Sequence, residues 1–150
     1  MKNFILVSLL TIGIAFFALP SKAQLRKVPA EVTDALKSKY PEASAVAWKD
    51  KITAFSADFE LNGEKYEARF SSKGEWQYTE NEIAENDLPA EVKDGLSKSK
   101  YADWQLRGVY NIDLPDNKLQ YRIQVSKSDL QKKNLLFSSE GQLLKDNITL

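Results

Sequence analysis

The spacing of apolar residues predicts a short amphipathic helix near residue 30. Pro29 suits the first turn of a helix, where its missing N–H costs nothing, and Pro41 ends the helix. Charged side chains occupy the outer side, so the helix should cover an apolar surface with its other side. Four residues at helical spacing form this apolar side: Val32, Ala35, Leu36 and Tyr40.

The same segment returns 60 residues later. Residues 28–36 read Val-Pro-Ala-Glu-Val-Thr-Asp-Ala-Leu, and residues 88–96 read Leu-Pro-Ala-Glu-Val-Lys-Asp-Gly-Leu. Each copy continues through a tyrosine and a tryptophan to a Phe-Ser-Ser-x-Gly turn. Self-similarity at a fixed period indicates a repeated folding unit. In the second copy Gly95 replaces Ala35, which should weaken that helix by up to about 1 kcal/mol.

Beyond each helix the apolar residues alternate with polar ones, which predicts strands. Asn62-Gly63 is a strong signal for a two-residue hairpin turn. Alternation on one side only is typical of an antiparallel sheet with one packed face and one wet face. We therefore expect the helices to cover the apolar face and the other face to stay polar. The expected strands lie at residues 45–49, 55–61, 66–70, 76–78, 104–110, 119–125, 135–137 and 142–144.

These elements predict an α+β fold of two tandem α-β4 repeats, with both helices packed on one face of an antiparallel sheet. We expect the first repeat at residues 24–82 and the second at residues 83–150, joined by an acidic linker at residues 80–87. The chain has no cysteine, so its stability must come from burial rather than from disulfides. This favours two repeats that share one continuous sheet or core.

The first 23 residues resemble a secretory signal peptide. A short positive start precedes an apolar run at residues 4–19, and small residues precede Gln24. We expect cleavage after Ala23 and a periplasmic or secreted product. The alternative is a membrane anchor, but a spanning helix needs about 20 apolar residues and this run is shorter. We therefore expect no membrane insertion of the mature chain.

The charge balance excludes partners that need a strongly basic surface. The signal segment holds two of the 21 basic residues and none of the 21 acidic ones, so the mature chain is slightly acidic. Such a chain lacks the electrostatic footprint of a nucleic-acid binder and has no polybasic patch for anionic lipid.

Common catalytic chemistry is missing from the chain. Histidine and cysteine are both absent, which excludes Ser-His-Asp and Cys-His catalysis and zinc sites with nitrogen or sulfur ligands. Asp113, Asp116 and Asn117 lack the glycine and the distal glutamate of a calcium loop. We expect no metal, no cofactor and no hydrolysis of peptides or β-lactams.

Candidate binding residues lie on the polar sheet face and among the aromatic residues. Alternation places Arg69, Arg122 and, less directly, Arg107 on the wet face beside Asp58, Glu60 and Glu67. The tryptophans Trp48, Trp76 and Trp104 fill the helix-facing core or, alternatively, stand on the open face as interface anchors. The simplest interpretation of the charged residues is a solvated face with cross-strand charge pairs.

The repeated Pro-Ala-Glu-Val starts, the Tyr-Pro-Glu-Ala-x-x-x-x-Trp stretch at residues 40–48 and the Phe-Ser-Ser-x-Gly turns resemble the β-lactamase-inhibitor-like, PepSY-like family of exported bacterial proteins. The resemblance implies helices on one face of an antiparallel sheet, similar to the β-lactamase inhibitor protein, whose concave sheet grips its enzyme. Related PepSY domains are associated with restraining secreted peptidases. The matching positions are core and turn positions, so no functional residue carries over.

We interpret the sequence as that of an exported, non-enzymatic binding module. Its expected partner is a protein or peptide held on the open sheet face, with inhibition of a secreted or periplasmic enzyme as the form of binding that the resemblance implies. The alternatives are a small-ligand or cell-envelope-glycan binder and a structural envelope protein without a discrete ligand. The sequence does not indicate an oligomeric state.

Overall fold

The computed structural model describes residues 26–148, so the expected signal peptide and its cleavage site lie outside the described residues. Within this part the chain forms two α-helices and eight strands of one antiparallel sheet. The predicted α+β class is therefore confirmed. Neither α-helix in this part has the length and apolar character needed to cross a membrane.

The first half of the described chain packs one helix on four strands. Pro29 stands at the start of the helix, where its carbonyl oxygen accepts the N–H groups of Val32 and Thr33. Val32 and Leu36 are buried against the phenylalanines of the sheet. The elements are α1 (Ala30–Lys39), β1 (Ser44–Asp50), β2 (Ala54–Leu61), β3 (Glu64–Ser71) and β4 (Trp76–Glu82).

The second half repeats this order of elements with two short additions. Pro89 starts the second helix as Pro29 starts the first, and its carbonyl oxygen also accepts two N–H groups. Val92, within this helix, is buried against strands β5, β6 and β7. The elements are η1 (Glu85–Asp87), α2 (Ala90–Ser97), β5 (Gln105–Leu114), η2 (Pro115–Asn117), β6 (Lys118–Ser126), β7 (Lys132–Ser138) and β8 (Leu143–Ile148).

The eight strands lie side by side in chain order, and every neighbouring pair is antiparallel. β4 pairs with β5 from Thr79 opposite Asp113 to Glu82 opposite Tyr110, so one sheet runs through both halves. The prediction of a linker at residues 80–87 is wrong for its first three residues, because residues 80–82 belong to β4. Pairing with β5 satisfies the backbone hydrogen bonds of these residues.

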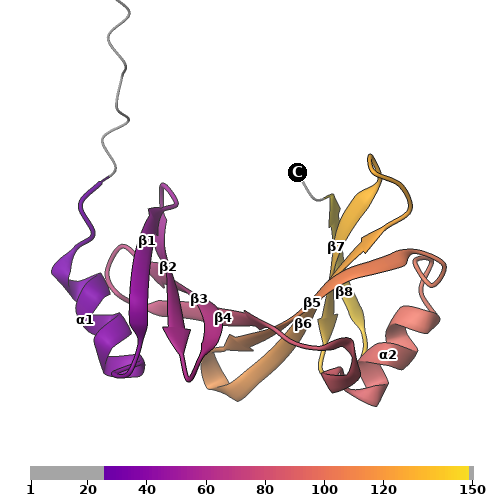
Figure 1. Cartoon of the computed structure of the whole chain (residues 1–150), viewed down its shortest axis with the longest axis horizontal. Coiled ribbons are helices and arrows are strands. Elements are labelled where there is room, and N and C mark those ends of the chain that lie inside the picture. The colour runs from indigo at the N-terminus through magenta and orange to yellow at the C-terminus, as the bar shows by residue number, and fades with distance from the viewer. Residues whose placement is uncertain (1–25, 149–150) are drawn as a thin grey trace, which may run out of the picture.

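The sheet curves into a trough with its two ends raised, as Figure 1 shows. α1 lies outside one end of the trough, and α2 lies outside the other. Among residues 26–148, no α-helix lies on either side of the middle of the sheet. The inner side of the trough is therefore left open along its whole length.

The hydrophobic core is divided, although the sheet is continuous. One cluster joins α1 to β2 and β3, and a second cluster joins α2 to strands β5, β6 and β7. Between the two clusters, the helix side of the β4–β5 pair carries polar residues: Thr79 faces Asp113, and Asn81 faces Asn111. The expectation of a shared sheet is thus met by the ladder between β4 and β5, while each helix keeps its own core.

Halfway along β5, the side of the strand that carries apolar residues changes. Val109 points into the α2 core, but Asn111 and Asp113 follow it on the same side. Ile112 lies on the helix-free side and is only 8% exposed. The expectation of a purely polar open face is therefore wrong here, because the end of β5 leaves the area that α2 covers and enters the curved middle of the sheet.

Each Phe-Ser-Ser-x-Gly turn packs against the first turn of its helix. Gly74 and Gly141 both have left-handed backbones, with φ of 83° and 80°. A Cβ on Gly74 would lie 2.5 Å from the carbonyl oxygen of Glu31, and a Cβ on Gly141 would collide with the carbonyl oxygen of Glu91. The two turn glycines therefore allow helix and sheet to approach closely.

Candidate functional site

The helix-free inner side of the eight-stranded sheet is called the concave face below. One row of side chains crosses five strands on this face, from Asp58 through Glu67, Glu80 and Ile112 to Gln120. All seven positions expected to share the wet face lie on this side and are at least partly exposed: 58, 60, 67, 69, 120, 122 and 124.

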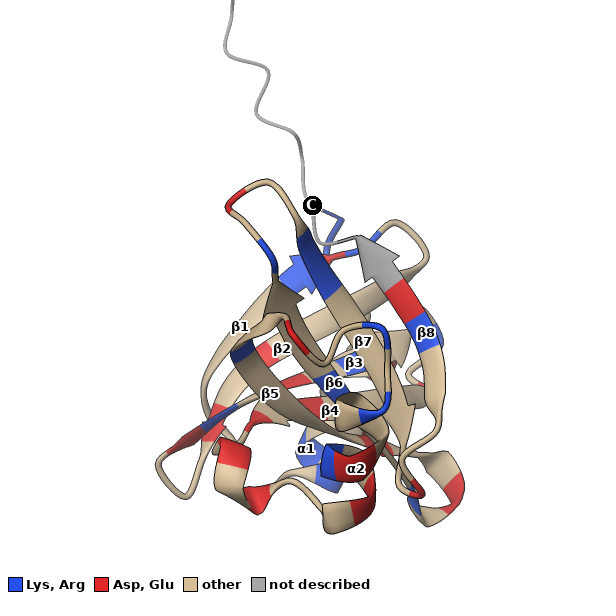
Figure 2. Ribbon diagram, turned by 90° about the vertical axis from the view of Figure 1, so that its right-hand side faces the viewer, with Lys and Arg blue, Asp and Glu red and all other residues tan. Residues whose placement is uncertain are grey.

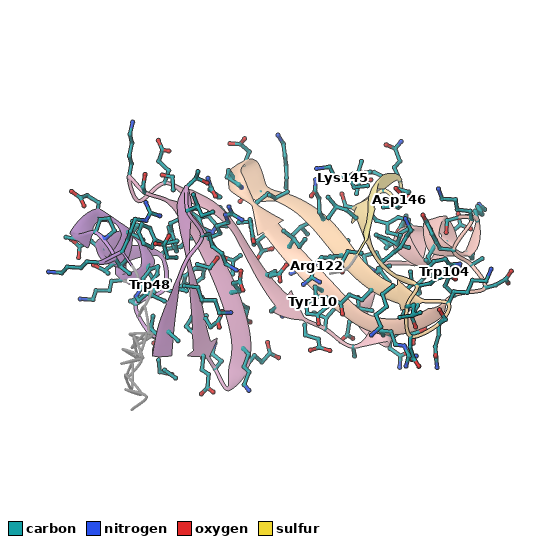
Figure 3. All side chains as sticks on the ribbon, turned by 90° about the horizontal axis from the view of Figure 1, so that it is seen from above. Trp48, Trp104, Tyr110, Arg122, Lys145 and Asp146 are labelled. Carbon is teal, nitrogen blue, oxygen red and sulfur yellow. The ribbon has the colours of Figure 1, made fainter. Side chains whose placement is uncertain are left out.

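Arg122 occupies the centre of the concave face. Its Nη2 atom is 2.7 Å from Glu80 Oε1, and its Nε atom is 3.2 Å from Glu80 Oε2. The guanidinium carbon lies 3.8 Å from the ring centroid of Tyr110, and Figure 3 shows these two side chains next to each other in the middle of the face. Both members of the ion pair are about one-fifth exposed, at 20% and 19%. Arg122 is therefore a structural ion-pair residue as well as a surface residue.

An acidic hollow of about 380 Å³ lies on one side of this centre. The rings of Tyr66 and Tyr110 form part of its wall. At the neighbouring edge of the face, Lys49 Nζ lies 2.6 Å from Asp58 Oδ2 and 3.6 Å from Glu67 Oε2. This contact confirms the expected cross-strand charge pairing. The carboxylates of the acidic hollow belong to Asp58, Glu60, Glu67, Glu80 and Glu82.

A second hollow of about 560 Å³, called the basic hollow below, lies on the other side of Arg122. Its charged groups are Arg69, Arg122, Lys145 and Glu80. Burial raises the pKa of the Tyr78 hydroxyl, which also lines the hollow, so this group stays a hydrogen-bond donor at neutral pH. The remaining wall is largely aliphatic and amide, with Ile112, Leu114, Leu136, Gln120 and Asn134.

The three tryptophans lie on the helix side of the sheet rather than on the concave face. Trp48 and Trp76 pack against the α1 core, and Trp104 packs against the α2 core. The indole N–H of Trp76 donates to Thr79 Oγ1 at 2.9 Å, and the hydroxyl of Tyr40 donates to the same oxygen at 2.7 Å. Of the two interpretations of the tryptophans, the structure favours core filling over interface anchoring on the open face.

Arg107 lies apart from the other candidate arginines. It is near the start of β5, whereas Arg122 pairs with Tyr110 farther along the strand. The register shifts between Leu106 and Gly108, so Arg107 is the bulged residue. Its Nε donates to Ser126 Oγ at 2.7 Å, which fixes the exposed side chain to the end of β6. The structure therefore does not bring Arg107 together with Arg69 and Arg122.

Two hairpin tips stand at the raised ends of the trough. Ile52, in the turn between β1 and β2, is 85% exposed, and Leu130, between β6 and β7, is 97% exposed. In Figure 1 both turns point to the side toward which the concave face opens. Each raised end therefore presents one large apolar side chain to solvent.

Two carboxylates with strongly lowered pKa values lie away from the concave face. Hydrogen bonds from Arg26 hold the pKa of Asp50 at about 2. The hydroxyl of Tyr101, followed by Lys100 at 2.9 Å, holds the pKa of Asp146 at about 2. Both groups tie the ends of the sheet to neighbouring segments, so they are structural. Figure 2 shows charges of both signs spread over the α2 end of the molecule.

Sequence reasoning misses several residues of the concave face. Tyr110, Leu136 and Lys145 lie in one row with Arg122 across β5 to β8. Alternation alone assigns each strand two sides but does not say which side of one strand matches which side of the next. A rule that sends apolar residues to the helix side places Leu136 and Ile112 there, whereas the structure has both on the concave face.

Solved structures with this fold include several proteins of Bacteroides species. A "putative periplasmic" protein of Bacteroides eggerthii is 27% identical, with a TM-score of 0.73, and the match covers 82% of this chain and 90% of that one. A BLIP-like protein of Bacteroides fragilis is 28% identical, with a TM-score of 0.71 and coverages of 84% and 89%. A DUF2874 family protein of Bacteroides ovatus is 26% identical, with a TM-score of 0.73 and coverages of 82% and 89%.

A comparison with curated proteins finds no match. Residues 53–145 match the family described as "Putative beta-lactamase-inhibitor-like, PepSY-like". The matched region runs from just before β2 into β8 and so contains the whole central part of the concave face. The chain belongs to this β-lactamase-inhibitor-like, PepSY-like family.

Proposed function

We propose that this protein is an exported, non-enzymatic module that binds a protein partner on its concave face. One observation carries the proposal: in the part of the chain that the structure describes, no α-helix covers the middle of the sheet, and a largely buried cluster of Arg122, Tyr110 and Glu80 lies at its centre. Tyrosine and arginine are the residue types that most often dominate binding energy at protein interfaces. Partner binding would complete the burial of this cluster.

Membership of an inhibitor-like family favours binding over catalysis. Inhibition of a secreted or periplasmic enzyme is the form of binding that we propose on this ground. Small-ligand sites usually gather a few polar groups in one enclosed pocket. Here the polar groups are spread over strands β2 to β8, which favours a partner as broad as a protein over a small ligand or a glycan.

The proposal includes export and tandem organisation. Residues 1–23 act as a cleaved signal peptide, a role supported by the description of the Bacteroides eggerthii neighbour as "putative periplasmic". Residues 24–82 and 83–150 form two PepSY-like repeats. The repeated order of one helix and four strands and the paired glycine turns support this division.

The test is capture of a partner by the immobilised mature chain, residues 24–150, from the periplasmic fraction of the source cells. A concave-face variant combines Glu60→Lys with Lys145→Glu, which reverses two exposed charges and preserves the net charge. A matched control combines Glu42→Lys with Lys37→Glu, at exposed positions at the end of α1 and just beyond it.

Mass spectrometry should identify a protein that the wild type and the control capture and that the concave-face variant captures at least tenfold less. Exposed charges contribute little to stability, so all three chains should melt alike. Equal capture by all three chains would contradict binding on the concave face. Turnover of a substrate that co-purifies with the chain and is lost on a single substitution would contradict the non-enzymatic assignment.

A further inference from the structure

The basic hollow combines unpaired positive charge with an apolar wall. Arg69, Arg122 and Lys145 carry the positive charges, and Glu80 is already bound by Arg122. Arg69 and Lys145 form no ion pair within the described residues. The Nε atom of Arg69 is buried and has no hydrogen-bond partner there. A buried polar group without a partner is costly, so the Nε–H group of this arginine indicates a missing acceptor, while the rest of its guanidinium interacts with the Tyr78 hydroxyl.

The apolar wall of the hollow indicates which kind of acceptor fits it. Ile112, Leu114 and Leu136 line the same hollow, and Ile112 is almost fully buried although it lies on the open face of the sheet. A free inorganic anion would bind the arginine but gain nothing from these side chains. A carboxylate attached next to an apolar group would satisfy both parts of the hollow.

We propose that the basic hollow binds an acidic side chain that a loop of the partner protein presents beside an apolar residue. The inference rests on the proposed function, because it names the partner chemistry for the same face. Arg69 and Lys145 receive the carboxylate, and Ile112, Leu114 and Leu136 receive the apolar neighbour. Arg122 stays with Glu80 and Tyr110 and forms the wall between this hollow and the acidic one.

The carboxylate comes from a side chain rather than from a chain terminus. Sites that capture a terminal carboxylate generally use a concave group of free backbone N–H groups. The strand residues around the basic hollow pair with at least one neighbouring strand, so no concave group of free backbone N–H groups is formed by the sheet there. The charged side chains of the hollow are therefore the groups that recognise the carboxylate.

The test uses two capped peptides that differ in one group, Ac-Leu-Asp-Leu-NH₂ and Ac-Leu-Asn-Leu-NH₂. Each is titrated into the ¹⁵N-labelled mature chain, and the Arg69 Nε–H signal and the amide signals of Ile112 and Leu136 are followed by NMR. The aspartate peptide should shift these three signals and should bind at least about tenfold more tightly than the asparagine peptide. Its affinity should fall with added salt.

Two variants check the assignment of the charges. Arg69→Gln and, separately, Lys145→Gln should each weaken binding of the aspartate peptide several-fold, whereas Arg107→Gln, at the far end of β5, should leave it unchanged. Lys145 is exposed, so its variant should stay folded even if loss of the Arg69 guanidinium disturbs the sheet. Well-dispersed spectra establish folding in each case.

Several results would overturn the inference. These are equal affinity for the two peptides, no shift with either, shifts confined to residues outside the basic hollow, or binding that survives both glutamine substitutions. Capture of a protein through the concave face without binding of the aspartate peptide would overturn this inference and leave the proposed function intact. Peptide binding without any captured protein would count against the proposed function instead.

Discussion

Gly95 is unfavourable for its helix but is required by the packing around it. A Cβ at this position would collide with the carbonyl oxygen of Gly141, in the turn that packs on α2. In the first half of the chain Ala35 occupies the matching position. The sequence alone predicts only a weaker helix at Gly95. The closer approach of turn and helix, which explains the residue, depends on tertiary structure.

At the residue scale, we expect Gly141→Ala to destabilise the fold by more than about 1 kcal/mol, because both the positive φ and the contact with Glu91 oppose a side chain. Gly63→Ala is the matched control. Gly63 has φ of 83° with nothing within 4 Å, so its substitution carries the backbone penalty alone. Urea unfolding should show a larger loss for Gly141→Ala, and equal losses would exclude the steric role of the turn.

Asp146 gives a second prediction at this scale. Its pKa in the folded chain is about 2, below its ordinary value of 3.8. A lowered pKa adds stability above the unfolded pKa, and this stability is lost as the pH falls through the folded pKa. The melting temperature of the wild type should therefore fall between about pH 5 and pH 2.

Asp146→Asn should melt lower at pH 6 and approach the wild type near pH 2, whereas Asp103→Asn should follow the wild type throughout. Parallel curves for wild type and Asp146→Asn would contradict the assignment.

At the element scale, the two helices occupy matching positions but do not bury them equally. Leu36 is 3% exposed in the α1 core, whereas its counterpart Leu96 is only partly buried against the α2 core. The sequence predicts equal contacts, because the two segments are nearly identical. The two helices also differ in the turn that packs on them, because only α2 has a glycine, Gly95, against the turn at Gly141.

We expect Leu36→Ala to lower the free energy of unfolding by about 2 to 5 kcal/mol, as is usual for a buried leucine in a packed core. Leu96→Ala should cost less, because part of its surface is already in contact with water. Denaturant unfolding of both variants measures the difference. A loss below about 1 kcal/mol for Leu36→Ala would be a typical surface effect and would contradict the packing of α1.

The elements themselves are predictable from local patterns. Pro29 and Pro89 start the helices, and Asn62-Gly63 forms the turn between β2 and β3. The direction in which β5 faces is not predictable, because Asn111 and Asp113 follow Val109 on the helix side. Which side of a strand is buried depends on what covers it, and α2 does not reach that far.

At the scale of the whole molecule, curvature decides what the concave face contains. The positions of Arg69 and Arg122 on one side follow from alternation, since both lie between apolar residues of their strands. Alternation does not predict that they lie near Lys145 and Leu136. That arrangement depends on the register of further strands and on the bend between the two halves. The ion pair of Arg122 with Glu80 also depends on the register between strands. Reversing the charge at Arg122 would therefore disturb the fold as well as binding.

The raised ends of the trough give the last prediction, which follows from binding on the concave face. A convex protein seated in the trough would meet both hairpin tips, where Ile52 and Leu130 stand almost fully exposed. A small ligand or short peptide at the centre would meet neither.

Because both side chains are exposed, Ile52→Ser with Leu130→Ser should leave the melting temperature nearly unchanged. The double variant should nevertheless release the captured partner several-fold faster in surface plasmon resonance, since the two substitutions remove short-range apolar packing against the partner. Leu119→Ser, at a partly exposed leucine on the helix side of β6, is the control and should release the partner at the wild-type rate. If the double variant also releases it at the wild-type rate, the partner contacts only the floor of the trough.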